Sequence, residues 1–281
     1  MRRRPAWPRK AADVAVKAAS VLAATLGLAA LAWILAVVLR NGAAAINWTF
    51  LTSLPSPPGG HGGGLGNAAV GTLAMTLLAC LLGIPVGIFA GVYLAEFGRG
   101  SRLATTVRFL VNVMMGVPSI IIGLFVYTIV VVSVGHFSGW AGGVALALLI
   151  LPVVARTSED MLALVPNALR ESSLALGAPR WRTTVQIAFR AAKAGLLTGV
   201  LLAVARVSGE TAPLLFTALN SPYWPRSLSG PTANLTMTIF NFAMSPYPNW
   251  HEAAWGASFL ITISVLALTV ISRALAREKK T

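Results

Sequence analysis

The sequence predicts an all-α membrane protein with six transmembrane helices and with both the N and C termini in the cytoplasm. The first observation behind this prediction is the composition, because 56% of the residues are hydrophobic and only 11% are charged. In an ordinary soluble domain about a quarter of the residues are charged. The second observation is a series of long apolar runs, and the third is the placement of basic residues between them. Together they exclude an ordinary soluble domain.

Six apolar runs reach or approach the roughly 20 residues that a helix needs to cross the hydrocarbon core of a bilayer. An even number of spans places both chain ends on one side. The fourth run is the shortest and contains Pro152, which leaves its cytoplasmic boundary open. The runs cover residues 18–39, 68–95, 106–134, 139–155, 195–219 and 252–272.

The basic residues give the orientation, because Lys and Arg in short loops are retained on the cytoplasmic side of the membrane. Of the 22 basic residues, all but three lie in or beside the segments that six spans place on the side of the N terminus. The exceptions are Arg40 and Arg226 in opposite loops and Arg206 within a span. The net charge of +14 is therefore a signal of topology. Because it is not gathered on one basic face, we expect no nucleic-acid partner.

Residues 1–17 are expected to form a cytoplasmic tail and residues 18–39 an N-terminal anchor helix. This run is longer than the roughly 7–15 apolar residues of a cleavable signal peptide, and Trp33 and Arg40 precede no convincing cleavage site. The triplet Ala43–Ala45 keeps cleavage open as an alternative. We expect a retained anchor.

Residues 40–67 are expected to form a periplasmic loop. Within it, residues 55–66 are so rich in proline and glycine that they cannot form a helix or a strand. They are no phosphate-binding loop, because no strand precedes them and the chain contains no Gly-x-x-x-x-Gly-Lys-Ser/Thr motif. We expect no cofactor bound by this chain, so ATP-driven transport would use an ATPase on another polypeptide.

No metal site and no catalytic group is expected. His61, His136 and His251 are scattered, and none has the second histidine of a zinc-binding helix beside it. Cys80 is alone in the second span and reads as a small apolar residue. Ser258 and His251 match no nucleophile pattern, which argues against a membrane enzyme.

The connecting segment 156–193 is the most informative stretch, because it is polar in a chain that is otherwise apolar. Pro166 and Asn167 can begin a short helix, the proline in the first turn and the asparagine as a cap for a free amide. Gly177 can end that helix in a left-handed conformation, and Pro179 can open the next one. Two short helices at an angle could enter a cleft on another protein. An ordinary amphipathic cytoplasmic loop is the alternative.

This segment resembles the loop by which permease subunits of ABC importers contact their ATPase. The family pattern has Glu-Ala-Ala, a glycine six residues after the glutamate and an isoleucine ten residues further on, and this chain has Glu171, Gly177 and Ile187 at those spacings. It departs from the pattern where two serines replace the alanines and Arg190 replaces a proline. The resemblance implies an ATPase-coupling loop with the candidate residues Arg170, Glu171, Ser172, Ser173, Gly177, Ala178, Trp181 and Ile187.

The fifth span contains two ionisable residues, each costing roughly 2.5–3.5 kcal/mol in the bilayer on insertion scales. Counted from Gly195, Arg206 lies about 16 Å along the helix, near the membrane midplane. Glu210 is four residues further on and is expected on the same helical face. Gly209 and Pro213 weaken the helix, as is tolerated beside a cavity. The candidate substrate pathway is Arg206, Ser208, Glu210 and Thr211. An internal ion pair that only locks two helices is the alternative.

Two further segments resemble permease subunits of the bacterial high-affinity phosphate ABC importer. They are Gly-Glu-Thr-Ala-Pro-Leu-Leu-Phe-Thr-Ala at 209–218 and Ile-Phe-Asn-Phe-Ala-Met-Ser-Pro-Tyr-Pro-Asn-Trp-His-Glu-Ala-Ala-Trp at 239–255. The resemblance extends from about Asn67 to the C terminus. It implies a type I ABC importer permease (MetI-like) fold in the bacterial inner membrane, with a permease core at 68–272 and a cytoplasmic tail at 273–281.

The resemblance also implies the partners: a homologous permease subunit, two copies of an ATPase subunit that uses ATP, and a periplasmic phosphate-binding protein. It further implies that Arg206 and Glu210 lie on the phosphate route. A permease of the same fold for molybdate, sulfate or phosphonate is the nearest alternative, and the Gly-Glu-Thr-Ala-Pro segment argues against it. A secondary transporter would need no ATPase and would leave the 156–193 segment unexplained.

Overall fold

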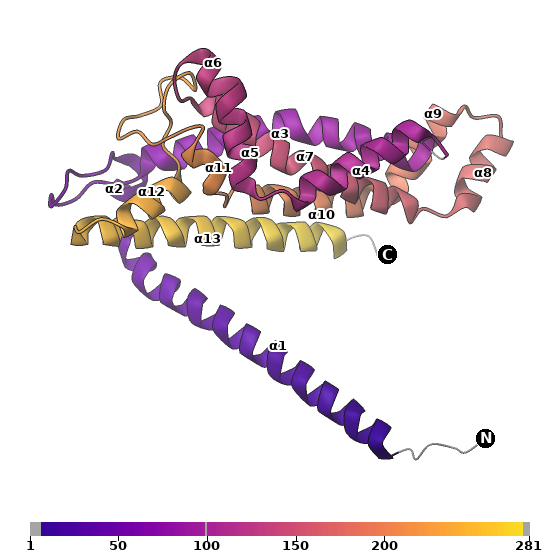
Figure 1. Ribbon diagram of the computed structural model, residues 1–281, viewed down its shortest axis with the longest axis horizontal. Coiled ribbons are helices and arrows are strands. Elements are labelled where there is room, and N and C mark those ends of the chain that lie inside the picture. The colour runs from indigo at the N-terminus through magenta and orange to yellow at the C-terminus, as the bar shows by residue number, and fades with distance from the viewer. Residues whose placement is uncertain (1–6, 99, 278–281) are drawn as a thin grey trace.

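The computed structural model describes residues 7–98 and 100–277 (Figure 1). These residues form helices and connections, with no strand among them. Five helices are long and apolar enough to cross a membrane, and a bent pair supplies a sixth span if it is counted as one. Several of the basic residues used for the topology prediction lie outside the described residues: Arg2, Arg3, Arg4, Arg99, Lys279 and Lys280.

The long helices take up most of the chain. The five helices and the two that form the bent pair are α1 (Trp7–Gly42), α3 (Gly66–Val92), α4 (Arg102–Gly116), α5 (Ser119–Val126), α7 (Gly139–Ala163), α10 (Phe189–Val207) and α13 (Pro248–Arg277). The shorter elements are η1 (Ala43–Ala45), α2 (Trp48–Thr52), η2 (Tyr93–Phe97), η3 (Tyr127–Val131), α6 (Val132–Val134), α8 (Asn167–Ala175), α9 (Arg180–Thr183), η4 (Thr184–Ala188), α11 (Ala212–Leu215) and α12 (Leu235–Ala243).

The third apolar run is not one straight helix, as the range 106–134 implied. It is broken between α4 and α5, which meet at a bend of 105°. The cause is Pro118, whose ring and missing N–H exclude it from a helix interior and hold Val117 in an extended conformation. The break places an irregular backbone segment inside an otherwise apolar region.

The helices of the fourth and fifth apolar runs have other bounds than the runs themselves. α7 continues past residue 155 to Ala163, and Pro152 lies inside it without ending it. The fifth span begins at Arg180, because α9, η4 and α10 form one continuous helix, and it ends at Val207 instead of 219. Residues 164–179 are therefore the part of the predicted loop that lies outside the long helices. Together with α9 they form residues 164–183, which we call the coupling loop.

α3 and α7 pack along a seam of glycines. Gly83, Gly87 and Gly91 recur every four residues and so share one face of α3. A Cβ added at Gly87 would lie 2.8 Å from Leu151 O, and one at Gly91 would lie 2.5 Å from Ser158 Cβ. Small residues at such positions let two membrane helices approach until their backbones touch.

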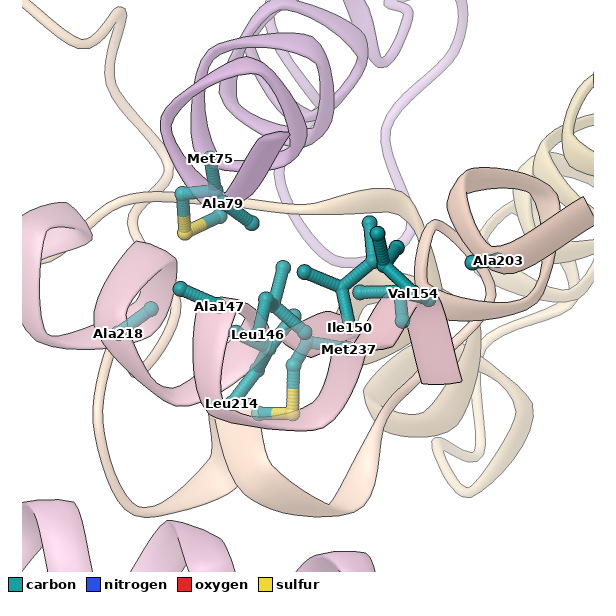
Figure 2. Packing of buried hydrophobic residues seen from close by; sticks show 11 residues of the cluster. Met75, Ala79, Leu146, Ala147, Ile150, Val154, Ala203, Leu214, Ala218 and Met237 are labelled. Carbon is teal, nitrogen blue, oxygen red and sulfur yellow. The ribbon is translucent and has the colours of Figure 1, made fainter. Parts of the chain in front are cut away.

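The largest buried cluster lies beside this seam and joins α3 and α7 to α10, α11 and α12. Figure 2 shows Met75 and Ala79 of α3 facing Leu146 and Ile150 of α7. The remaining members of the cluster are Ala147, Val154, Ala203, Val207, Leu214, Ala218 and Met237. Five helices are thus fixed to one another by close packing, which gives the segments between them defined positions.

The helices run lengthwise, with α8 and α9 at one end of the molecule and α2, α6 and α12 at the other (Figure 1). The beginning of α1 and the end of α13 both point toward the end that carries α8 and α9. α1 splays away from the bundle and meets α13 near its own C-terminal end, where a Cβ on Gly42 would lie 2.5 Å from Trp255 O.

Residues 55–65 of the glycine-rich segment form neither helix nor strand, as predicted, but Gly66 already begins α3. α2 and η1 also lie within the predicted 40–67 loop. The segment is held against the start of α13. Trp250 Nε1 donates a hydrogen bond to Ser56 O at 3.0 Å, and Asn249 Nδ2 donates one to Ser56 Oγ at 3.2 Å. The segment therefore wraps over the end of the molecule opposite to the coupling loop.

Candidate translocation and coupling sites

The coupling loop has the local structure that its sequence predicts. α8 begins at Asn167, directly after Pro166, and Gly177 beyond its end has a φ of +82°. Pro179 precedes α9 as its N-cap. One detail is wrong, because no side chain caps the N terminus of α8. α8 and α9 are joined by a glycine in the left-handed region, where a residue with a Cβ is strained. The second of the two predicted short helices is not separate, because α9 is the first turn of the long helix that starts at Arg180.

Half of the eight candidate coupling residues are exposed, and none is fully buried. α8 has no buried residue, and Glu171 and Ser172 are exposed. Ser173 Oγ makes a hydrogen bond of 2.9 Å with Thr183 Oγ1 of α9, which fixes the angle between the two short helices. The exposed fraction of Trp181 is 58%. Ala178 and Ile187 are half-buried. The outer face of the loop is thus free for a partner in this single chain.

Arg170 differs from its neighbours on α8, because its side chain turns inward and is only 11% exposed. Its guanidinium contacts the Glu96 carboxylate of η2, with a shortest distance of 2.6 Å between Nη2 and Oε1. The same nitrogen donates to Leu162 O of α7 at 2.7 Å, and Nη1 donates to Val165 O. Sequence reasoning did not find Glu96, because it stands 74 positions from Arg170.

A second ionic contact joins α4 to α7. Arg108 Nη2 lies 2.6 Å from Glu159 Oε1, and Arg156 Nη1 lies 3.6 Å from Glu159 Oε2. Arg156 Nε also donates to Asp160 Oδ2 at 3.2 Å, one turn along the same helix. These acids were not predicted either. The spacing of Arg156 and Asp160 by four residues is the signal that could have found one of them.

The structure changes the environment predicted for Arg206 and Glu210. Since α10 ends at Val207, Glu210 lies beyond the helix and cannot share a helical face with Arg206. Among the described residues no ion pair joins the two. The estimate that Arg206 lies midway along the span also loses its basis, because the helix starts at Arg180. Arg206 is exposed and Glu210 is half-buried in the single chain.

The two charged residues nevertheless line one cavity of about 160 Å³. The cavity lies at the break between α4 and α5, and its wall includes Ser119 at the start of α5. Met114 and Met115 of α4 and Leu149, Pro152 and Val153 of α7 supply apolar lining. Among the lining residues, Arg206 carries a guanidinium, Glu210 a carboxylate and Ser119 a hydroxyl. A guanidinium and a hydroxyl can donate hydrogen bonds to the oxygens of an anion, whereas a carboxylate repels it. Ser119 was missed because the break at Pro118 was not expected.

The other two pathway candidates are not brought to this cavity. Ser208 caps α10 and its hydroxyl donates to Ala205 O at 2.9 Å. Thr211 lines a separate cavity with Leu31 and Leu35 of α1. The backbone between them is fixed where Thr236 Oγ1 donates to Glu210 O at 2.8 Å. The structure thus joins Arg206 and Glu210 and separates them from Ser208 and Thr211.

Comparison with known protein families shows the class of transport protein to which this chain belongs. Residues 83–278 match the family described as binding-protein-dependent transport system inner membrane components. The chain belongs to this family, and it is a multi-pass protein of the inner membrane.

Named relatives narrow the class. The phosphate transport system permease protein PstA of Yersinia pestis is 47% identical over 99% of this chain and 94% of its own length. PstA of Pasteurella multocida is 50% identical over 90% of each chain. A chain in the structure of the MetNI methionine ABC transporter in inward-facing conformations covers 76% of this chain and 95% of its own, with a TM-score of 0.64 at 23% identity. That likeness concerns the fold alone, and it confirms the predicted MetI-like ABC permease fold.

Proposed function

We propose that this chain is the transmembrane permease subunit of an ATP-driven importer of inorganic phosphate. The relatives named PstA, similar over nearly the full chain, support the substrate. The structural observation that carries the proposal is the cavity at the α4–α5 break, which Arg206 and Glu210 both line. The chain binds no nucleotide in this proposal, and ATP is hydrolysed by a partner.

The exposure of Arg206 supports a role in a path or an interface. A guanidinium facing lipid costs several kcal/mol, so an arginine that is exposed on a membrane helix of the single chain is expected to face water or another subunit. Arginine offers five donors in a planar fork that suits the oxygens of a phosphate group. We infer that Arg206 raises the local potential for the anion. Glu210 keeps that attraction from holding the anion too tightly for release.

The coupling loop supports an ATPase partner. Its exposed face carries Glu171 and Trp181, and its shape is fixed by Gly177 and by the Ser173–Thr183 hydrogen bond. In the proposed cycle, closure of two ATPase subunits displaces the loop, and the helices rock so that phosphate from a binding protein meets an open cavity. A homologous permease subunit would complete the pathway beside this chain, and a periplasmic phosphate-binding protein would deliver the anion.

The test measures uptake of radiolabelled phosphate in cells that lack the subunit and carry one variant. Arg206→Gln should reduce uptake to the level of cells without the chain, while the complex still assembles, because a neutral amide removes the potential and keeps much of the volume. Arg226→Gln, at an exposed arginine outside the cavity, is the matched control and should leave uptake unchanged. If Arg206→Gln together with Glu210→Gln transported at the full rate, neither charge would be needed for transport and the pathway role would be wrong.

A further inference from the structure

The inward-turned side chain of Arg170 is out of place on a surface helix. α8 has no buried residue, yet the Arg170 side chain is 11% exposed and that of its partner Glu96 is 8% exposed. The rest of α8 faces outward, where the proposed ATPase would bind. One side chain therefore reaches from the proposed docking surface into the end of the helical bundle.

The contacts of Arg170 join three elements. Nε lies 3.1 Å from both carboxylate oxygens of Glu96, and Nη2 lies 2.6 Å from one of them. Nη2 also donates to Leu162 O in the last turn of α7, and Nη1 donates to Val165 O just beyond it. Leu162 O also accepts a hydrogen bond from Val165 N at 3.2 Å. The guanidinium therefore adds a further donor at the end of α7 and contacts the end of the α3–η2 helix with the same group.

The geometry of the guanidinium makes this connection rigid. Its planar fork presents several donors in a fixed arrangement, so two acceptor groups held by it cannot move independently of α8. A lysine has a single charged nitrogen on a flexible stem and cannot reproduce the fork. Since α3 and α7 are already packed backbone to backbone along the glycine seam, a force on Arg170 acts on both helices together.

We propose that Arg170 is a positioning residue through which displacement of the coupling loop reaches the ends of α3 and α7, and that Glu96 is its counterpart. This inference rests on the proposed function, because it assumes that an ATPase binds the loop. Arg170 is then a connection behind the docking surface instead of a docking residue. The pair should matter for coupling even when the ATPase remains bound.

Two variants separate coupling from folding. Arg170→Lys keeps the positive charge, so Glu96 is not left alone, but it loses the fork. Arg170→Gln with Glu96→Gln removes both charges and leaves two amides that can hydrogen-bond. Arg273→Gln, at an exposed arginine near the end of α13 and outside the loop, is the matched control for loss of a positive charge.

The first measurement uses the assembled complex in proteoliposomes and records phosphate transported per ATP hydrolysed, together with the amount of ATPase that co-purifies. We expect both variants to retain the ATPase and to lower the transport ratio at least fivefold, with the control unchanged. An unchanged ratio in both variants would overturn the proposal. Failure of both variants to assemble would overturn it too, because the pair would then serve folding alone.

The second measurement does not depend on the substrate. Cys80 is the single cysteine of the chain, so a Cys80→Ala background with Ser119→Cys places one thiol in the wall of the Arg206 cavity. ATP should change the rate at which a thiol reagent labels this position, and Arg170→Lys should abolish that change. If the complex carried no phosphate yet labelling responded to ATP only with Arg170 present, the proposed substrate would be wrong and the positioning role would stand.

Discussion

Two arginines show how differently a charge can be held in this molecule. Arg170 of the coupling loop is enclosed and contacts Glu96 and two carbonyl oxygens. Arg206 of α10 is exposed, lines a cavity, and makes no ion pair among the described residues. Both arginines belong to segments that the sequence predicts to be functional, so the sequence alone does not show that their environments differ.

The two arginines differ in how many hydrogen-bond donors of the guanidinium remain free for a ligand. A guanidinium whose donors are already taken by protein oxygens is fixed in place and stabilises the elements that it joins. A guanidinium beside an open space can still donate hydrogen bonds to a ligand. We therefore assign Arg170 to the connection between loop and bundle and Arg206 to the anion path. Four predictions test this contrast, in order of decreasing expected effect.

The first prediction concerns the sides of the membrane on which the two ends of the molecule lie. The basic residues predict that the coupling loop lies in the cytoplasm, so a reporter fused after Thr281 should be active in the cytoplasm and one inserted near Gly63 should be active outside. The expected difference is all or none. A cytoplasmic signal from an insertion at Gly63 would contradict the orientation and remove the ATPase from reach of the loop.

The second prediction compares the stability supplied by the two charges. Glu96→Ala leaves the enclosed Arg170 guanidinium without its counter-ion, and breaking a buried pair in this way costs about 3 kcal/mol. Arg206→Ala removes an exposed side chain and should change stability much less. Thermal unfolding of the purified complex in detergent measures both. Equal destabilisation by the two variants would show that the two arginines are held alike.

The third prediction compares the same backbone strain at two positions, one in the coupling loop and one outside it. Gly177 and Gly135 have φ values of +82° and +83°, and a Cβ on either would meet no atom within 4 Å. A valine at each position should therefore cost a similar amount, about 1–2 kcal/mol. Gly177 lies between α8 and α9, and Gly135 follows α6. These elements are at opposite ends of the molecule (Figure 1). Co-purification should show loss of the ATPase for Gly177→Val and retention for Gly135→Val; loss in both would mean that general instability is the cause.

The smallest effect is expected for the second ionic contact. Arg108→Gln breaks the pair between α4 and α7, but Arg108 is 39% exposed and Arg156 still lies near Glu159. Such screened pairs are worth about 0.5–1 kcal/mol. The shift in thermal unfolding should be smaller than for Glu96→Ala, and smaller still in high salt. A shift as large as that of Glu96→Ala would indicate that α4 and α7 depend on this pair.

The sequence predicted the helical class, the membrane location and the form of the coupling loop, because these depend on local patterns. Apolar length marks a span, and Gly177 between two proline-led helices marks a turn. The partners of Arg170 and Arg108 could not be predicted, since Glu96 and Glu159 reach them only through packing of helices distant in sequence. Two of the polar residues that line the cavity, Arg206 and Glu210, were predicted as functional. The third, Ser119, was not predicted, because it reaches the cavity only through the break of the helix at Pro118.

The glycine seam between α3 and α7 has a mechanical consequence. Two helices whose backbones touch along several turns move as one rigid pair, because neither helix can slide or tilt against the other without steric overlap. Conformational changes during a transport cycle are then expected in flexible backbone segments outside α3 and α7. The chain has irregular backbone at 117–118, 164–166 and 208–211. The first of these segments borders the Arg206 cavity, the second begins the coupling loop, and the third follows α10. Bending at a few bonds in these segments can change the cavity while α3 and α7 keep their packing.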